Sequence, residues 1–125
     1  MLVPYNVSTG ALTLAASATA TASVVITFPT TGDFICNRLT GQVLQSSVIV
    51  QTWGGTLSIS ADGKLPWTSQ AIVPWAALVG DAKTPFQLDP EVVIKAGSTL
   101  TVSVLNNVAT ATICYLVFVG NMEIA

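Results

Sequence analysis

The chain has 125 residues, of which 51% are apolar and only 8% are charged, and its formal net charge is −2. This composition excludes a disordered chain, which requires low hydrophobicity and high charge, and three Lys with one Arg give no basic patch for nucleic acid. Because an average soluble domain is about 25% charged, the polarity of this chain rests on hydroxyl groups, which 16 Thr and 10 Ser supply.

Short β-branched runs, in which apolar and polar residues alternate, recur along the whole chain. They are bounded by Gly, Pro, Asn or Asp, and this pattern is typical of strands. The segment from Ala15 to Ser23 is biased toward Ala, Thr and Ser. We expect a loop there, with a poor strand or an arm on a neighbouring molecule as alternatives. The predicted strands cover residues 10–16, 22–28, 33–40, 43–53, 56–60, 86–88, 91–95, 98–105 and 109–119.

The middle of the chain carries turn signals. Asp62-Gly63 predicts a tight turn after the strand at 56–60. Pro74 suits the first position of a helix and Gly80 can end one, so a short helical turn is predicted from Pro74 to Val79. The residues from Gly80 to Pro90 are expected to form a loop.

Asn106-Asn107 predicts a tight hairpin turn between the last two strands. Asn tolerates the positive φ that a two-residue type I′ turn requires. In the resulting register Val104 faces Ala109, and along the pair apolar residues meet apolar residues while hydroxyls meet hydroxyls.

The last strand contains the longest apolar run, seven residues from Ile113 to Val119. A membrane-spanning helix needs about 20 such residues, so this run is too short to be one. It is apolar on both faces, and such a strand is either central in a sandwich or covered by another subunit.

These elements predict an all-β fold. A chain of this length forms one domain, residues 1–125. Many short strands around one core indicate a single antiparallel β-sandwich, and eight strands with long connections favour an eight-stranded jelly roll with one short helical turn. An immunoglobulin-like fold fits less well, because the 78 residues between Cys36 and Cys114 are a long spacing for that fold.

The sequence offers no catalytic machinery. Without His, the Ser–His–Asp and Cys–His arrangements are impossible. The acidic residues are scattered over turns, and the only close pair, Asp89 and Glu91, flanks Pro90 in an expected solvated loop. We therefore predict no enzyme activity, no catalytic or cofactor-binding residues, no cofactor and no metal site.

Cys36 and Cys114 lie far apart in strand-like segments, with no CxxC motif and no third cysteine. We expect both to be reduced thiols in the core, where a thiol behaves as a small hydrophobe. A cross-sheet disulfide is the alternative.

The three tryptophans, Trp53, Trp67 and Trp75, lie in the middle third of the chain. They can fill the core or one end of the sandwich, or they can anchor a partner or stack on a sugar, since Trp is enriched at binding hot spots. The candidate interface residues are Trp67, Trp75 and Phe86.

The C-terminal half carries a more specific pattern. An aromatic–Pro loop leads to an Ala-Gly-Ser turn, a hydroxyl-rich strand, an Asn turn and a closing apolar strand that stops at Gly120. This order of strands and turns resembles small β-sandwich virion proteins of bacteriophages, and Asp33-Phe34 resembles an early strand of that family. The residues concerned are 85–90, 92–94, 96–102, Asn106 and Gly120, with Arg38 and Gly41 upstream.

The resemblance implies a jelly-roll structural protein of the virus particle, acting as a capsid cement, decoration or minor capsid protein. The implied partners are the major capsid protein or other virion proteins and further copies of the chain, as a dimer or trimer, with no direct contact to nucleic acid or membrane. The implied location is the virion, assembled in the host cytoplasm, and we expect no secretory signal. The alternatives are a tail, collar or fibre component, and a carbohydrate-binding or adhesin-like module that uses Trp67 and Trp75.

Overall fold

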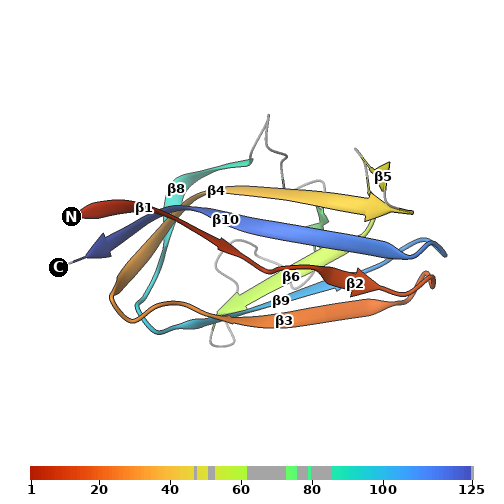
Figure 1. Ribbon diagram of the computed structural model, residues 1–125, viewed down its shortest axis with the longest axis horizontal. Helices are drawn as coiled ribbons and strands as arrows, with labels where there is room; N and C mark the ends of the chain where they lie inside the picture. Colours follow the sequence, from red (N-terminus) through yellow and green to blue (C-terminus); the bar gives the residue numbers. More distant parts are fainter. Residues whose placement is uncertain (47, 51–52, 62–72, 76–78, 80–85, 125) are drawn as a thin grey trace.

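The computed structural model of the protein describes residues 1–46, 48–50, 53–61, 73–75, 79 and 86–124. In this part the chain forms two antiparallel sheets that pack face to face, so the predicted β-sandwich is confirmed (Figure 1). The strands are β1 (Leu2–Ser8), β2 (Leu12–Leu14), β3 (Thr21–Thr27), β4 (Gly32–Gln45), β5 (Val48–Ile49), β6 (Thr56–Ala61), β7 (Val73–Pro74), β8 (Phe86–Ile94), β9 (Thr99–Leu105) and β10 (Thr112–Ile124).

The order of the strands is that of a jelly roll. One sheet has the order β1-β10-β4-β5, with β2 also pairing β10 and β8 also pairing β4, and the other has the order β3-β9-β6-β7. If β1 and β2 count as one interrupted strand and β5 is set aside, the described strands number eight. Numbered along the chain, they have the sheet orders 1-8-3-6 and 2-7-4-5, the arrangement of an eight-stranded jelly roll.

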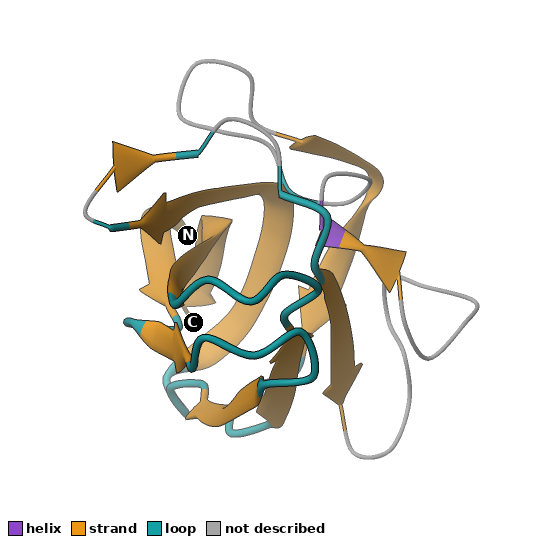
Figure 2. Cartoon of the chain, turned by 90° about the vertical axis from the view of Figure 1, so that its right-hand side faces the viewer, coloured by secondary structure: helices purple, strands orange, loops and turns teal. Residues whose placement is uncertain are grey.

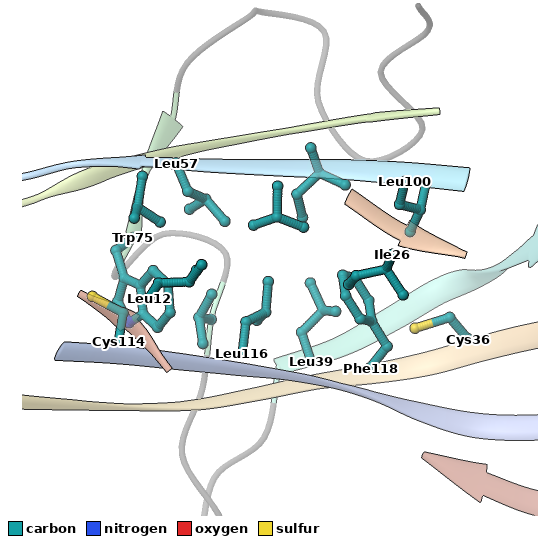
Figure 3. Close-up of a cluster of buried hydrophobic side chains, with 14 of the residues drawn as sticks. Leu12, Ile26, Cys36, Leu39, Leu57, Trp75, Leu100, Cys114, Leu116 and Phe118 are labelled. Carbon is teal, nitrogen blue, oxygen red and sulfur yellow. The ribbon is translucent and has the colours of Figure 1, made fainter. Parts of the chain in front are cut away.

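The hydrophobic core lies between the two sheets. Figure 3 shows Leu116 and Phe118 of β10 and Leu39 of β4 pointing toward Leu57 of β6 and Leu100 of β9. Every second residue is buried along β9, and along β10 as far as Met122, because side chains alternate between the two faces of a strand. Phe28, Phe34 and Phe118 form an aromatic cluster within this core, with the Phe28 ring centroid 5.4 Å from that of Phe34 and 6.3 Å from that of Phe118.

The strand pattern differs from the prediction in three places. Strand β1 was not expected, because Pro4 and Asn6 break the alternation and the strand lies at a sheet edge with few buried residues. The predicted strands at 33–40 and 43–53 form one strand, β4, up to Gln45. Those at 86–88 and 91–95 form β8, which passes through Pro90 because an edge strand tolerates a missing N–H donor.

The structure describes both ends of the predicted helical turn, at residues 74–75 and at residue 79. Val79 N–H donates to the Trp75 carbonyl at 2.9 Å, the i to i+4 spacing of an α-helical turn, while Pro74 closes strand β7. A Cβ at Gly41 would lie 2.7 Å from Val79 and 2.8 Å from the Trp75 ring, so Gly41 lets these two residues pack closely on β4. The predicted turn at Asp62-Gly63 lies outside the described residues, as do residues 80–85 of the loop predicted from Gly80 to Pro90. Residues 86–90 of that loop, including Asp89, belong to strand β8, so the loop prediction is wrong there.

The predicted hairpin at Asn106-Asn107 is wrong. Strands β9 and β10 belong to different sheets, so Val104 pairs with Ala22 and Leu57 rather than with Ala109. A type I′ turn needs positive φ at both central residues, and among the described non-glycine residues only Ser46 has positive φ. Residues 106–111 instead cross from one sheet to the other.

Asn106 is fully buried and holds this crossover in place. Its Oδ1 accepts hydrogen bonds from Trp53 Nε1 at 3.4 Å and from the Asn107 N–H at 3.0 Å. Its Nδ2 donates to the carbonyls of Thr110 at 2.9 Å and Ala15 at 3.3 Å. Since Ala15 begins the loop that crosses from β2 to β3, one amide side chain joins both crossovers at this end of the sandwich.

Replacing Asn106 by Ala removes the hydrogen-bond partner of the buried Trp53 Nε1–H and of several partly buried backbone groups. We expect Asn106→Ala to lower the free energy of unfolding by about 3 kcal/mol, because each such group costs about 1–3 kcal/mol. Urea unfolding measures the change. The exposed neighbour is the matched control: Asn107→Ala should change stability by less than about 0.5 kcal/mol. Equal effects of the two substitutions would contradict the role assigned to Asn106.

Candidate interaction surfaces

Few charged groups interrupt the described surface. Five charged side chains lie in the described part of the chain: Asp33, Arg38, Glu91, Lys95 and Glu123. Asp33 accepts hydrogen bonds from the Ala96 N–H at 2.9 Å and from Lys95 Nζ at 3.4 Å. The bond from Ala96 is the main cause that lowers the pKa of Asp33. This cluster ties the turn between β8 and β9 to β4, which is a structural role.

The outer surface of the larger sheet is apolar. Strand β10 buries Cys114, Leu116 and Phe118, so the residues between them point away from the core. The register places Ile113 beside Leu44, which in turn pairs with Ile49 of β5, and Ile35 of β4 pairs with the exposed Val93 of β8. We call this surface the apolar face; it consists of Ile35, Leu44, Ile49, Val93, Ile113, Tyr115, Val117 and Val119.

Polar neighbours on the apolar face are mostly uncharged. Val117 pairs with Thr40 of β4 and with Ser8 of β1, and Tyr115 pairs with Gln42. Arg38, which pairs with Val119, lies within this face, and its Nε donates to Asn37 Oδ1 at 3.3 Å. Asp33 and Glu123, which pair with each other, lie at the end of the same face beyond Ile35. Val93 and Ile49 are each 53% exposed. Such a contiguous apolar surface marks an interaction site more often than isolated exposed residues do.

The outer surface of the smaller sheet is covered by hydroxyl groups. In strands β3, β6 and β9 the Val, Leu and Ile side chains point into the core, apart from Val25 and Leu105. The Ser and Thr residues of these strands point to the other side of the sheet. One row across the sheet reads Ser23, Ser103 and Ser58. We call this the hydroxyl face; it consists of Thr21, Ser23, Thr27, Ser58, Ser60, Thr99, Thr101 and Ser103, with Val25 and Leu105 as its apolar members. The Oγ1 atom of Thr56, in the next row, is buried.

Of the three residues that the sequence indicated as a candidate interface, the structure describes the side chain of Trp75. Trp75 is 5% exposed and packs against Trp53, with ring centroids 5.5 Å apart, so both indoles belong to the core. Phe86 lies on β8 and pairs with Leu39 through the backbone, but its side chain is outside the described part. Trp67 also lies outside the described residues. The apolar face was not anticipated as a set, although the run at 113–119 contains half of it.

Both cysteines are free and buried, as expected. Cys36 pairs with Gly120, and Cys114 lies six positions away along the same strand. At about 3.4 Å per residue this separation is about 20 Å, far beyond the roughly 7 Å that a disulfide can join. Burial raises the pKa of each thiol to about 12.

The described part of the chain contains neither a candidate metal cluster nor a candidate membrane-spanning helix. No group of three or more His, Cys, Asp or Glu side chains there is placed to hold a metal ion. None of its helical residues belongs to a helix long and apolar enough to cross a membrane.

Comparison with known protein families finds no family model that matches this chain, and comparison with curated proteins finds no match either. The functional argument therefore depends on the fold and on its two outer faces.

The raised thiol pKa values predict low reactivity. In the folded protein at pH 8, a thiol-specific disulfide reagent should label neither cysteine within the time that labels both in urea. The folded state also holds the thiol protons more tightly than the unfolded state, whose pKa is near 9. This difference in thiol pKa between the folded and unfolded states stabilises the folded protein fully below about pH 9, and the stabilisation is lost as the pH rises toward 12. Rapid labelling of either thiol in the folded protein would contradict the burial described here.

Proposed function

We propose that this chain is a structural protein of a virus particle, a capsid cement, decoration or minor capsid protein that stabilises the shell through contacts with itself and with shell proteins. The observation that carries the proposal is the pair of outer faces. One is largely apolar, with Arg38 within it and Asp33 and Glu123 at one end, and the other consists of hydroxyl groups without a charged residue in its described part. Well-behaved surfaces of free domains carry about 25–35% charged residues.

In the lattice of a capsid, neighbouring subunits would cover such surfaces. Each 100 Å² of apolar surface that is buried contributes at most about 2.5 kcal/mol before the costs of association. One contact of this size is weak. Repetition around a shell raises the effective concentration of every further contact, so many weak contacts together bind firmly.

We assign the apolar face to the shell contact. It is the apolar one of the two faces, it is centred on β10, and the long pairing between β4 and β10 makes it rigid. A preformed rigid surface loses little conformational entropy when it binds. A tail, collar or fibre protein would use the same surface for its contacts. The location of the chain in the virus particle is therefore a question for the first experiment below.

The first test is the composition of the virus particle. Mass spectrometry of purified particles of the virus that encodes this chain should find the protein in many copies, and separated capsids should retain it. Its absence from the particles would overturn the proposal. Its presence only in separated tails would replace the capsid location by a tail location.

The second test changes the apolar face. We expect Val117→Lys to weaken binding to particles that lack the protein by about tenfold or more, because burying an unpaired ammonium group costs more than 1.4 kcal/mol, the equivalent of tenfold. Co-sedimentation of the purified chain with such particles measures binding. The control is Ser103→Lys on the hydroxyl face, which adds the same charge and should bind like the wild type. Equal binding by all three proteins would overturn the assignment of the apolar face.

A further inference from the structure

Strand β3 forms an open edge of the smaller sheet. It pairs with β9 on one side, and no other described strand pairs with it. It has seven residues, from Thr21 to Thr27, with no charged residue, Pro or Gly among them. An open edge presents a row of unpaired N–H and C=O groups that can pair with another chain.

The other described edges carry the features that prevent such pairing. Strand β1 contains Pro4, and β8 contains Pro90 and Glu91. Strand β2 has only three residues, strands β5 and β7 have only two each, and β7 includes Pro74. Proline, charge and short length are the usual protection of an edge strand. Within the described part of the chain, β3 is the edge that lacks all three.

The backbone groups that face the open edge can be identified. The Phe28 N–H donates to the Ser98 carbonyl at 2.9 Å, and the Ala20 carbonyl accepts from the Asn106 N–H at 2.8 Å, so both even-numbered residues face β9. Backbone groups alternate in direction along an antiparallel strand. The residues whose N–H and C=O groups point to the open edge are therefore Thr21, Ser23, Val25 and Thr27.

We propose that two copies of this chain pair antiparallel through β3, about a two-fold axis at Val24, and so join their smaller sheets into one continuous sheet. The inference rests on the proposed function, for which it names the surface of self-association. A two-fold interface uses the same patch on both copies. In this register Thr21 lies opposite Thr27, and Ser23 lies opposite Val25.

Strand β3 is complementary to itself in this register. Each pair formed by Thr21 with Thr27, or by Ser23 with Val25, exchanges two backbone hydrogen bonds. The core-facing residues Ala22 and Ile26 lie opposite each other, and the hydroxyl faces of the two copies become continuous. A slip by one residue would place core-facing side chains beside outward ones. No like charges oppose each other, because β3 has none.

Cysteine cross-linking tests the register. Val24 lies opposite its own copy in a pair without hydrogen bonds, where the Cα atoms are about 4.5 Å apart, within the range of a disulfide. We expect Val24→Cys to form a disulfide-linked dimer in most molecules under mild oxidation. The matched control is Val25→Cys, whose copies lie diagonally at about 7–8 Å, beyond reach of a disulfide.

The control is also the more accessible thiol, because Val25 is 62% exposed. Random collision would therefore cross-link Val25→Cys faster than Val24→Cys. That result, or the absence of a cross-linked dimer in Val24→Cys, would overturn the proposed register. Cys36 and Cys114 are buried, so the wild type should give no dimer under the same oxidation.

Charge on the edge tests the pairing without a cross-link. The double variant Ser23→Lys and Val25→Lys places ammonium groups directly opposite each other across the two-fold axis. We expect it to raise the dimer dissociation constant by about tenfold or more, as measured by sedimentation. The control is Ser58→Lys with Ser60→Lys on β6, which adds equal charge to the same face and should leave the dimer intact.

These experiments distinguish a failure of the proposed β3 pairing from a failure of the proposed function in a virus particle. If the wild type associates and the double variant on β3 associates equally well, the pairing of β3 is wrong, and the assignment of the apolar face to the shell is unaffected. If the β3 variant becomes monomeric but the protein is absent from virus particles, the pairing stands and the proposed function fails.

Discussion

The long antiparallel pairing of β4 with β10 determines the arrangement of the rest of the molecule. It runs from Gln45 opposite Thr112 to Gly32 opposite Ile124, and it fixes which side chains of both strands face the core. The register shifts once, between Val119 and Gly120, where a Cβ on Gly120 would collide with the backbone of Ile35 and Cys36. Glycine at this position therefore lets the two strands remain paired through a bulge. The sandwich has two layers, so the smaller sheet covers one face of β10 and the other face of β10 lies on the outside. Seen from the end, in Figure 2, the sheets curl around the shared interior.

The two outer faces differ in chemistry, and this difference suggests separate roles. The apolar face gains free energy when any large surface removes it from water, at about 25 cal/mol per Å². The hydroxyl face gains less from burial, because each hydroxyl must exchange water for another partner. Its strand β3 offers directional backbone bonds at an edge instead. We therefore assign shell contact to the larger sheet and pairing between copies to the smaller one, and the interior, with Trp53 and Trp75, keeps both in place.

The sequence predicted those strands whose two faces differ most. In β3, β6 and β9 hydroxyls alternate with Val, Ile and Leu, so period-two alternation located them closely. Strand number and long connections predicted the jelly roll. The hairpin at Asn106 failed because an alternating strand matches any alternating neighbour equally well, and sequence pattern does not say in which sheet that neighbour lies. The buried role of Asn106 depends on Trp53 and Ala15, which are distant along the chain. The position of Trp75 was left open for a related reason: a Trp side chain is as well suited to a core as to a surface, and only the packing against Trp53 distinguishes the two.

The central claim is that the outer surface of this fold is too poor in charge to stay uncovered. Light scattering of the isolated wild-type chain over a wide concentration range tests it most directly. The account predicts a mass above the 12.9 kDa of one chain, rising with concentration toward a dimer or larger assembly. A constant mass of one chain at every concentration, in a solution that stays clear, would contradict it.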